Sequence, residues 1–306
     1  MEGADVYHGG AHFLRDAAAS GRYSGCVKVL RAAGEMQAAS TEAKRSGRLV
    51  TLVPTMGALH EGHIALIRHA HEQQGLVVVS IYVNPTQFGP DDDFKHYPRD
   101  LDADCHACER ENVDLVFAPS DEEMYPSGSV TTWIEEAKLA KRFEGEKRPG
   151  HFCGVCTVVA KLFNIVQPNV AIFGKKDYQQ LKVIERMVRD LRYPVGIASV
   201  PTVREPDGLA ASSRNQHLTS ADRAQATVLW KSLGVVRDLF NHGEHSPHRL
   251  EAAVTRTISL APVARLDYAA VVDAETLEPV HEAKHGDVVL VAAYVGKTRL
   301  IDNVIL

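Results

Sequence analysis

The feature that most constrains this chain is the regular alternation of short apolar runs with amphipathic stretches through its first two-thirds. The runs are rich in Val, Ile and Leu, which is typical of strands buried on both faces of a parallel sheet. Repeated strand–helix–strand units predict an α/β fold with helices on both faces of that sheet. The predicted strands are 49–53, 76–83, 113–118, 130–134, 170–173 and 195–200, and the predicted helices are 62–74, 101–112, 154–165 and 177–191.

The last third of the chain has a different pattern. A capping-box-like sequence at Thr219–Asp222 begins a predicted helix, and short β-rich runs with turn signals follow two helices. This favours a smaller α+β C-terminal domain after a Rossmann-like domain. The predicted elements here are helices 219–240 and 248–260 and strands 266–272, 288–294 and 298–304. The predicted division is a weakly ordered extension at 1–24, a Rossmann-like domain at 25–201 and a C-terminal domain at 202–306.

Charge and hydropathy exclude several classes of protein. In 306 residues, 34 Lys and Arg stand against 39 Asp and Glu, a net charge of −5, which argues against a general binder of nucleic acid. No apolar run approaches the roughly 20 residues of a membrane-spanning helix. Acidic residues such as Glu2 and Asp5 lie at the N-terminus, unlike a secretory or transit signal. We therefore expect a cytoplasmic protein without a membrane or nucleic-acid partner.

The five cysteines raise an alternative, a zinc or redox module. Cys105/Cys108 and Cys153/Cys156 each form a C-x-x-C pair, but 44 residues separate the pairs. Zinc-binding pairs are usually separated by roughly 15–20 residues. Both pairs fall in predicted helices, so we favour small buried side chains one helical turn apart. The odd count favours reduced thiols in the cytoplasm.

A glycine-containing turn follows the first predicted strand, where the ligands of a parallel sheet bind. Residues 56–63 read MGALHEGH and precede a predicted helix. Free backbone N–H groups and the positive end of a helix favour a bound anion there. His60 and His63, three residues apart, lie on one face and can donate hydrogen bonds to phosphate. Gly62 lets a ligand approach the backbone closely.

Three further polar turns come at the ends of later strands or just beyond them. Gln87, in NPTQFG, suits a hydroxyl or carboxylate ligand. Lys176, in FGKKDYQQ, can meet a phosphate, and Gln180 one turn later faces the same predicted cleft as Gln87. Residues 212–214, Ser-Ser-Arg, can clamp a polyphosphate. Taken singly, each turn could be an ordinary solvated loop, and the acidic residues 91–93 favour a solvated loop over a metal site.

Taken together, four strings in order between residues 50 and 218 resemble the pantoate–β-alanine ligase family. They are PTMGALHEGH, VNPTQFG, FGKKDYQQ and PTVREPDGLAASSRN. This family belongs to the HxGH nucleotidylyl-transferase superfamily. The resemblance implies an enzyme of pantothenate and coenzyme A biosynthesis that uses ATP and Mg²⁺. It implies condensation of D-pantoate with β-alanine through a pantoyl-adenylate, with release of pyrophosphate and then AMP. It also implies a cytoplasmic homodimer whose C-terminal domain acts as a lid.

The resemblance also implies roles for individual positions. His60, His63 and Lys176 correspond to the catalytic groups, with His63 at the position usually given the proton-donor role. Gln87 and Gln180 correspond to the pair that holds pantoate, and Gln87 also lies toward β-alanine. The implied ATP-binding residues are Met56, Gly57, His60, Gly62, His63, Gly174, Lys175, Lys176, Asp177, Val203, Ala211, Ser212, Ser213 and Arg214.

The sequence departs from the family pattern at a few positions. Lys175 stands where Glu is frequent, and Ala211 where Met is frequent. The acidic residues after Tyr97 do not reproduce the positions given to Mg²⁺ in relatives, so no metal ligand is predicted and the ion is expected to be held mainly by phosphates. The alternative function is a nucleotidylyltransferase that acts on a phosphorylated acceptor, which would share the HxGH motif.

Overall fold

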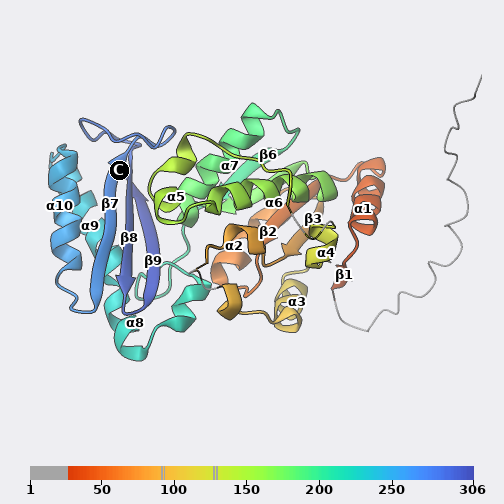
Figure 1. The fold of residues 1–306 in the computed structure, drawn as a ribbon, viewed down its shortest axis with the longest axis horizontal. Coiled ribbons are helices and arrows are strands. Elements are labelled where there is room, and N and C mark those ends of the chain that lie inside the picture. Colours follow the sequence, from red (N-terminus) through yellow and green to blue (C-terminus); the bar gives the residue numbers. More distant parts are fainter. Residues whose placement is uncertain (1–26, 91, 93, 127, 129) are drawn as a thin grey trace, which may run out of the picture.

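The computed structural model describes residues 27–306 except positions 91, 93, 127 and 129. It contains a six-stranded sheet from the first two-thirds of the chain and a three-stranded sheet from the last third (Figure 1). The predicted α/β class with a smaller C-terminal α+β part is confirmed. The predicted extension at 1–24 and Cys26 lie outside the described residues.

The six-stranded sheet is parallel throughout. Its order is β1-β4-β3-β2-β5-β6. From β2 the chain moves outward to β3 and β4, then returns to place β5 on the other side of β2. The order therefore reverses between β2 and β5, which is where ligands bind in open α/β sheets. The strands are β1 Lys28–Leu30, β2 Val50–Thr55, β3 Leu76–Ile81, β4 Leu115–Phe117, β5 Val170–Gly174 and β6 Gly196–Val200.

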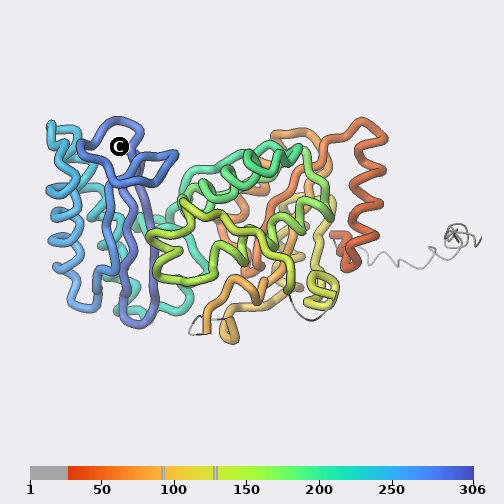
Figure 2. The backbone as a smooth tube through the Cα atoms, turned by 45° about the horizontal axis from the view of Figure 1, so that its top comes forward, coloured from red at the N-terminus to blue at the C-terminus, as the bar shows by residue number. Residues whose placement is uncertain are grey.

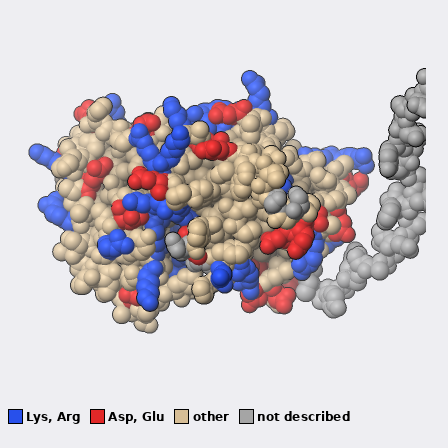
Figure 3. Space-filling model, in the orientation of Figure 1, with Lys and Arg blue, Asp and Glu red and all other residues tan. Residues whose placement is uncertain are grey.

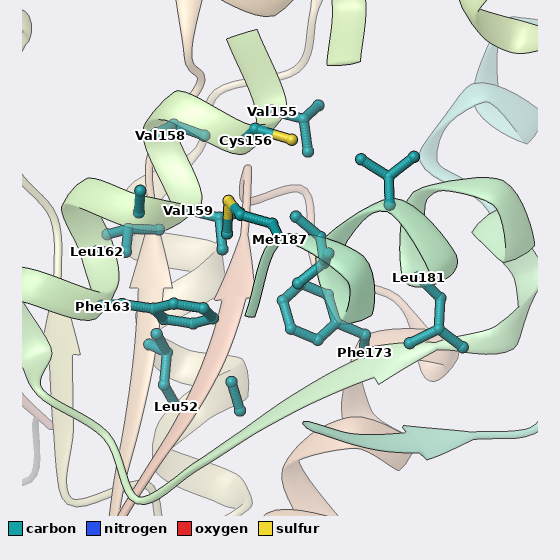
Figure 4. Packing of buried hydrophobic residues seen from close by; sticks show 14 of the residues in the cluster. Leu52, Val155, Cys156, Val158, Val159, Leu162, Phe163, Phe173, Leu181 and Met187 are labelled. Atoms are coloured by element: carbon teal, nitrogen blue, oxygen red, sulfur yellow. The ribbon is translucent and has the colours of Figure 1, made fainter. Parts of the chain in front are cut away.

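Helices cover both faces of this sheet. Successive strand residues point to opposite faces, so Leu52 packs with α6 while Val53 packs with α2. Figure 4 shows Leu52 beneath the apolar side chains of α6. One face carries α1 Ala33–Arg45, α6 His151–Val166 and α7 Tyr178–Asp190, and the other carries α2 Glu61–His71 and α3 Leu101–Arg110. Short helical segments are α4 Asp121–Met124, α5 Glu144–Lys147, η1 Pro85–Gln87, η2 Phe94–His96, η3 Leu139–Lys141 and η4 Lys175–Asp177.

The three-stranded sheet is antiparallel, in the order β7-β8-β9. One face packs on α9 and α10 through residues such as Val291, and the opposite face turns Leu290 toward the first part of the chain. Figure 2 shows this part at one end of an elongated molecule and α1 at the other. Its elements are η5 Ser213–His217, α8 Ser220–Ala226, α9 Val228–Asn241, α10 Pro247–Ile258, β7 Ala264–Val272, β8 Val288–Val295 and β9 Thr298–Ile305.

A buried ionic cluster joins the two parts. The Glu144 carboxylate of α5 accepts hydrogen bonds from both terminal nitrogens of Arg299, at 2.7 and 2.8 Å, and from the Tyr268 hydroxyl at 2.9 Å. Burial would raise the pKa of Glu144, but the hydrogen bonds and charge of Arg299 hold it below its ordinary value. Asp267 also binds Arg299, at 2.9 Å. Removing one partner of such a pair typically costs roughly 3–5 kcal/mol, so the cluster fixes how the two parts meet.

Three predicted elements differ from the structure. The predicted strand at 130–134 is absent from both sheets of the described chain, since the Ile134 N–H donates to the Thr157 hydroxyl of α6 at 3.0 Å. The single helix predicted at 219–240 is two helices, α8 and α9. They divide at Thr227, whose hydroxyl bonds the Ala224 carbonyl at 3.3 Å. The first predicted strand does not end before Pro54 but continues through it to Thr55.

Candidate active site

The site begins where β2 and β5 separate. The Val50 carbonyl faces the β5 side, where it accepts from the Asn169 N–H at 2.7 Å, so Pro54 has its nitrogen on that side too. Pairing with β5 covers Thr51 and Leu52 and then stops. At Pro54 no β5 residue is left to accept a hydrogen bond from a backbone N–H, so the missing N–H of proline costs no ladder bond. This explains why a proline is tolerated in a central strand.

Two adjoining cavities open from this gap. The inner cavity, about 230 Å³, lies between the strand ends and α6. The outer cavity, about 790 Å³, lies between the two parts of the molecule and shares residues such as Lys176 and Arg214 with the inner one. Figure 3 shows several Lys and Arg side chains around the junction of the two parts. The predicted residues that line the inner cavity are Met56, His60, Gly62, His63, Gln87, Gly174, Lys176, Asp177, Gln180, Val203, Ala211, Ser212, Ser213 and Arg214.

Two predicted ATP-binding residues, Gly57 and Lys175, line neither cavity. Gly57 has φ +78°, and a Cβ there would lie 2.6 Å from a carboxylate oxygen of Asp104. Asp104, buried in α3, accepts hydrogen bonds from the N–H groups of Ala58 at 3.0 Å and Leu59 at 2.8 Å. Gly57 is therefore required for the turn itself, because it makes room for the carboxylate that holds the turn.

His60 and His63 form the first turn of α2. His60 is the N-cap, and its Nδ1 accepts from the Gly62 N–H at 3.1 Å, while the Nδ1 of His63 accepts from the His60 N–H at 3.3 Å. A Cβ at Gly62 would lie 2.7 Å from the His60 ring, so only glycine fits beneath it. Since each Nδ1 is an acceptor, each neutral ring carries its proton on Nε2. Both Nε2–H groups are thus free to donate to a ligand.

The electrostatics of the site keep these rings neutral. Burial, followed by the positive charge of Lys176, lowers the pKa of His60 to about 4. Burial, followed by the neighbouring His60, lowers the pKa of His63 to about 3. The ring centroids are 4.1 Å apart, a distance at which two imidazolium ions would repel each other strongly. The pair therefore offers neutral hydrogen-bond donors to the inner cavity.

Lys176 and Asp177 belong to η4, directly after β5. The Lys176 ammonium lies 3.5 Å from the Asp177 carboxylate. Burial would raise the pKa of Asp177, but Lys176 and then Arg214 hold it below its ordinary value. The inner cavity thus contains an ionised carboxylate, Asp177, together with the two cations Lys176 and Arg214 and the two histidines.

Gln87 is held by a polar cluster beneath it. Its side-chain oxygen accepts from Asn84 at 3.1 Å, and Asn84 also donates to the Gly154 carbonyl at 3.2 Å and accepts from the Tyr125 hydroxyl at 2.7 Å. Gly154 lets α6 approach closely, since a Cβ there would lie 2.3 Å from the Thr86 carbonyl oxygen. Asn84 is 1% exposed and lines the inner cavity. Its place in the string VNPTQFG was the available signal, but no role was predicted for it.

Arg148 and His151 are site residues that the sequence motifs missed. Arg148 lines both cavities and binds Asp92 at 2.8 Å. It also donates to Nε2 of His151 at 3.0 Å, so the Nδ1–H of His151 donates to the Gln87 carbonyl at 2.8 Å. Burial, and then Arg148, lowers the pKa of His151 to about 4. The chain Asp92–Arg148–His151 therefore connects a fixed guanidinium to the backbone of Gln87.

The last predicted motif faces these residues from η5 and the segment before it. The Ser212 hydroxyl accepts from the Arg214 N–H at 3.3 Å, and the Ser213 hydroxyl lies 3.4 Å from the Tyr97 hydroxyl. The Ala211 N–H donates to the Val203 carbonyl at 2.9 Å, which joins two predicted nucleotide segments. All four motifs thus meet at one gap in the sheet, as their positions after strands predicted.

The cysteine pairs lie apart from this site and from each other. Cys108 belongs to the cluster that includes α2, and Cys156 to the cluster on the opposite face of the sheet. Figure 4 shows Cys156 among apolar side chains. Burial raises the pKa of each of these two thiols to about 12. In the described residues, no three metal-ligating side chains gather into a metal site, and no helix has the length and apolarity to span a membrane.

Comparisons with known proteins agree with this geometry. The family model for pantoate-beta-alanine ligase matches residues 28–305. A pantothenate synthetase from Thermotoga neapolitana is 50% identical over 280 residues, covering 92% of this chain and 100% of the relative. The crystal structure of pantothenate synthetase from Thermus thermophilus has a TM-score of 0.85 at 45% identity, covering 91% of this chain and 99% of that one.

A crystal structure from Francisella tularensis is described as pantoate-beta-alanine ligase complexed with beta-gamma ATP and beta-alanine. Its TM-score is 0.75 at 34% identity, covering 91% of this chain and 97% of that one. The match extends over the parallel sheet, all four motifs and the C-terminal sheet. The chain belongs to the pantoate-beta-alanine ligase family.

Proposed function

We propose that this chain condenses D-pantoate with β-alanine, using ATP, to form pantothenate. The observation that carries the proposal is the inner cavity, which gathers the two histidines, Gln87, Gln180, Lys176 and Arg214 at the gap between β2 and β5. A cavity of this kind combines donors for phosphate with an amide pair for a small polar acid. Family membership supports the same reaction.

ATP is assigned to the polar side of the gap. We assign the Nε2–H groups of His60 and His63 and the ammonium of Lys176 to stabilising the charge that builds on the α-phosphate. Arg214, with the hydroxyls of Ser212 and Ser213, is assigned to the leaving pyrophosphate. The backbone at Val203 is assigned to the adenine end. The histidines need not accept a proton from the nucleophile, because the attacking carboxylate is already deprotonated.

Pantoate is assigned to the inner end of the cavity. Gln87 and Gln180 offer amide donors and acceptors for its hydroxyls and carboxylate. The same cavity is lined by apolar side chains of α6, among them Val155, Val158 and Leu162, which suit the two methyl groups of pantoate. This combination of an apolar wall with two amides distinguishes pantoate from a phosphorylated acceptor, which would require further cations at the same depth.

The Francisella relative is described as complexed with β-alanine, and in this chain we assign the β-alanine carboxylate to Arg148. The Arg148 guanidinium is already oriented by Asp92 and His151 and lines both cavities. A fixed guanidinium binds a carboxylate strongly. The amine of β-alanine would then lie toward Gln87, where the acyl group is formed.

Mg²⁺ is assigned to the ATP phosphates with a single protein carboxylate. Asp177 is the only Asp or Glu among the described residues that line the inner cavity, and its pKa is held low. Mg²⁺ is commonly bound by one or two carboxylates together with substrate phosphates, so this donor set fits the ion. When bound, the ion would neutralise phosphate charge that Lys176 and Arg214 leave uncompensated.

The reaction then has two steps. A pantoate carboxylate oxygen attacks the α-phosphorus of ATP, a P–O bond forms, and pyrophosphate leaves with the broken bond's electron pair. The neutral amine of β-alanine attacks the acyl carbon, the amide forms, and AMP leaves with the pantoate oxygen while the amine loses a proton. Positioning and electrostatics supply most of the acceleration. The part after residue 201, which we propose as a separate lid domain, would exclude water from the adenylate.

We also propose a cytoplasmic homodimer. The segment 130–134 is rich in β-branched residues, belongs to neither sheet of the described chain, and leaves Trp133 46% exposed. A partly exposed, β-branched segment of this kind can contact the same segment of a second copy. Light scattering of the purified chain tests the dimer, and a monomer at micromolar concentration would contradict it.

The first step has a direct test, exchange of labelled pyrophosphate into ATP in the presence of D-pantoate and Mg²⁺ but no β-alanine. Reversible formation of the adenylate predicts exchange that depends on pantoate. A nucleotidylyltransferase for phosphorylated acceptors predicts no exchange with pantoate but exchange with its own acceptor. Absence of exchange with pantoate would contradict the proposal.

A further inference from the structure

The two neighbouring residues Asp302 and Asn303 of β9 are buried and polar in the middle of a strand, at 3% and 7% exposure. Their side chains point to opposite faces of the three-stranded sheet. Asp302 is paired with Val291 of β8, which packs on α9 and α10. Asn303 is paired with Leu290 of β8, which faces the first part of the chain. One strand therefore presents polar groups to both sides.

Asn303 reaches the turn that carries Lys176. Its side-chain nitrogen donates to the carbonyls of Lys175 and Lys176, at 2.9 Å each. These two bonds cross from the C-terminal sheet to the backbone directly beneath the Lys176 side chain. A buried amide that satisfies two carbonyls at once leaves that backbone little freedom to move.

Asp302 holds the other nucleotide segment. It receives two hydrogen bonds from Arg204, at 2.7 and 3.0 Å, and the guanidinium of Arg204 also lies 3.6 Å above the Trp230 ring. Arg204 directly follows Val203, whose carbonyl accepts from the Ala211 N–H. A bidentate, buried pair of this kind fixes orientation as well as distance.

We propose that Asn303 is a positioning residue for Lys176, and that with Asp302 it makes β9 the element that sets the spacing between the two nucleotide-binding segments. The inference rests on the proposed role of Lys176. In this arrangement the Lys176 ammonium is correctly placed only while the C-terminal part is docked. The two hydrogen bonds from Asn303 are thus one of the contacts that dock the two parts, and they also hold the backbone of the catalytic lysine.

The test compares four proteins by pantoate-dependent pyrophosphate exchange, namely the parent, Asn303→Leu, Lys176→Ala and the double variant. Leucine has a branched side chain of four non-hydrogen atoms, as asparagine does, but it cannot donate a hydrogen bond. A misplacement of about 1 Å can cost roughly 100-fold in rate, so we expect Asn303→Leu to lower the exchange rate roughly 10- to 100-fold. Because Asn303 acts through Lys176, the double variant should match Lys176→Ala within about 3-fold.

Two further variants separate positioning from general damage. Asn303→Asp keeps the shape, loses both donated bonds, and serves if leucine prevents folding; it should also slow the exchange. Glu278→Gln removes the exposed ion pair with Arg142, at 2.8 Å, which also joins the two parts but touches neither turn. It should leave the exchange rate unchanged.

Three outcomes would overturn the inference. Normal exchange in both Asn303 variants, with Lys176→Ala inactive, would overturn the positioning role alone. Losses that multiply in the double variant would show that Asn303 acts independently of Lys176. Near-normal exchange in Lys176→Ala would overturn the proposed role of the lysine, and this inference with it.

Discussion

The Nδ1 of His63 accepts a hydrogen bond from the backbone N–H of His60 at 3.3 Å, while the two rings lie 4.1 Å apart. The N-terminus of α2 thereby determines which nitrogen of each ring carries the proton. In an ordinary helix, the side chain of a serine or aspartate N-cap accepts a hydrogen bond from a backbone N–H of the first turn. In α2 the imidazole of His60 accepts this bond from the Gly62 N–H. The same hydrogen bonds that cap the helix therefore leave the Nε2–H group of each ring available to a ligand in the cavity.

This arrangement predicts how substitutions of His63 differ. Glutamine can place an amide N–H near the position of Nε2, whereas asparagine reproduces Nδ1. We expect His63→Ala and His63→Asn to lower kcat/KM for ATP by roughly 100- to 1,000-fold, the cost of removing one preorganised donor. His63→Gln should retain clearly more activity than either. Equal losses in all three variants would show that Nε2–H donation is not the function.

A histidine elsewhere on the same helix provides the matched control. His71 lies at the end of α2, where its Nε2 bonds the Glu111 carbonyl at 2.7 Å, and it lines neither cavity. His71→Gln should leave kcat/KM unchanged. Thermal unfolding of both variants then separates loss of a donor from loss of the helix.

The lowered histidine pKa values predict the pH dependence of stability. The unfolded chain binds these protons near pH 6.5, but folded His60 and His63 bind them only near pH 4 and 3. Between these limits the unfolded state holds more protons, so the free energy of unfolding decreases as pH falls. We expect a Tm that is level from pH 8 to 6.5 and decreases steadily below it. In His63→Gln the decrease should be less steep, and a Tm that rises on acidification would contradict this view.

The turn before the histidines depends on Asp104. Asp104→Asn keeps the size of the side chain but replaces one acceptor oxygen with an NH₂ donor. The backbone N–H of either Ala58 or Leu59 then faces another donor and loses its hydrogen bond. A donor left unpaired costs roughly 1–3 kcal/mol, so we expect a lower free energy of unfolding and a raised KM for ATP. Urea denaturation and steady-state kinetics measure the two effects. Asp102→Asn, an exposed position in the same helix, should change neither.

The assignment of β-alanine to Arg148 predicts a separation of the two steps. A charge-assisted hydrogen bond contributes roughly 1.5–3 kcal/mol, so Arg148→Ala should raise the KM for β-alanine roughly 10- to 150-fold. Pyrophosphate exchange with pantoate alone should change by less than about 5-fold. The exposed Arg142→Ala, as control, should alter neither quantity. If the exchange reaction collapses while the KM for β-alanine is unaffected, Arg148 belongs to the first step instead.

The sequence identified most of the fold because periodicity reports burial on strands and helices directly. It missed β1, since a three-residue edge strand, Lys28–Leu30, carries almost no periodic signal, and it also predicted no helix at α1, Ala33–Arg45. It misjudged Pro54 because a proline is tolerated only where the neighbouring strand has already diverged, and that is a property of the sheet. Likewise Thr227 divides a helix through a side-chain bond that periodicity does not reveal.

The sequence predicted which residues would lie close together where those residues follow strands, but it did not predict the residues that contact and support them. His60, Gln87 and Lys176 come at strand ends, so topology alone brings them together. Asn303 bonds the backbone of Lys176, which is 127 positions away in the chain, and Arg148 bonds Asp92, which is 56 positions away. No local pattern marks such partners. Only the docking of the two parts and the packing of α6 reveal them.

Isotope transfer tests the central claim most directly. D-Pantoate labelled with ¹⁸O in both carboxylate oxygens is incubated with ATP, Mg²⁺ and β-alanine, and the phosphorylated products are examined by mass spectrometry. Formation of a pantoyl-adenylate predicts one ¹⁸O atom in AMP, none in pyrophosphate, and pantothenate formed in equal amount. Unlabelled AMP, or label in orthophosphate with ADP as the other product, would contradict the account.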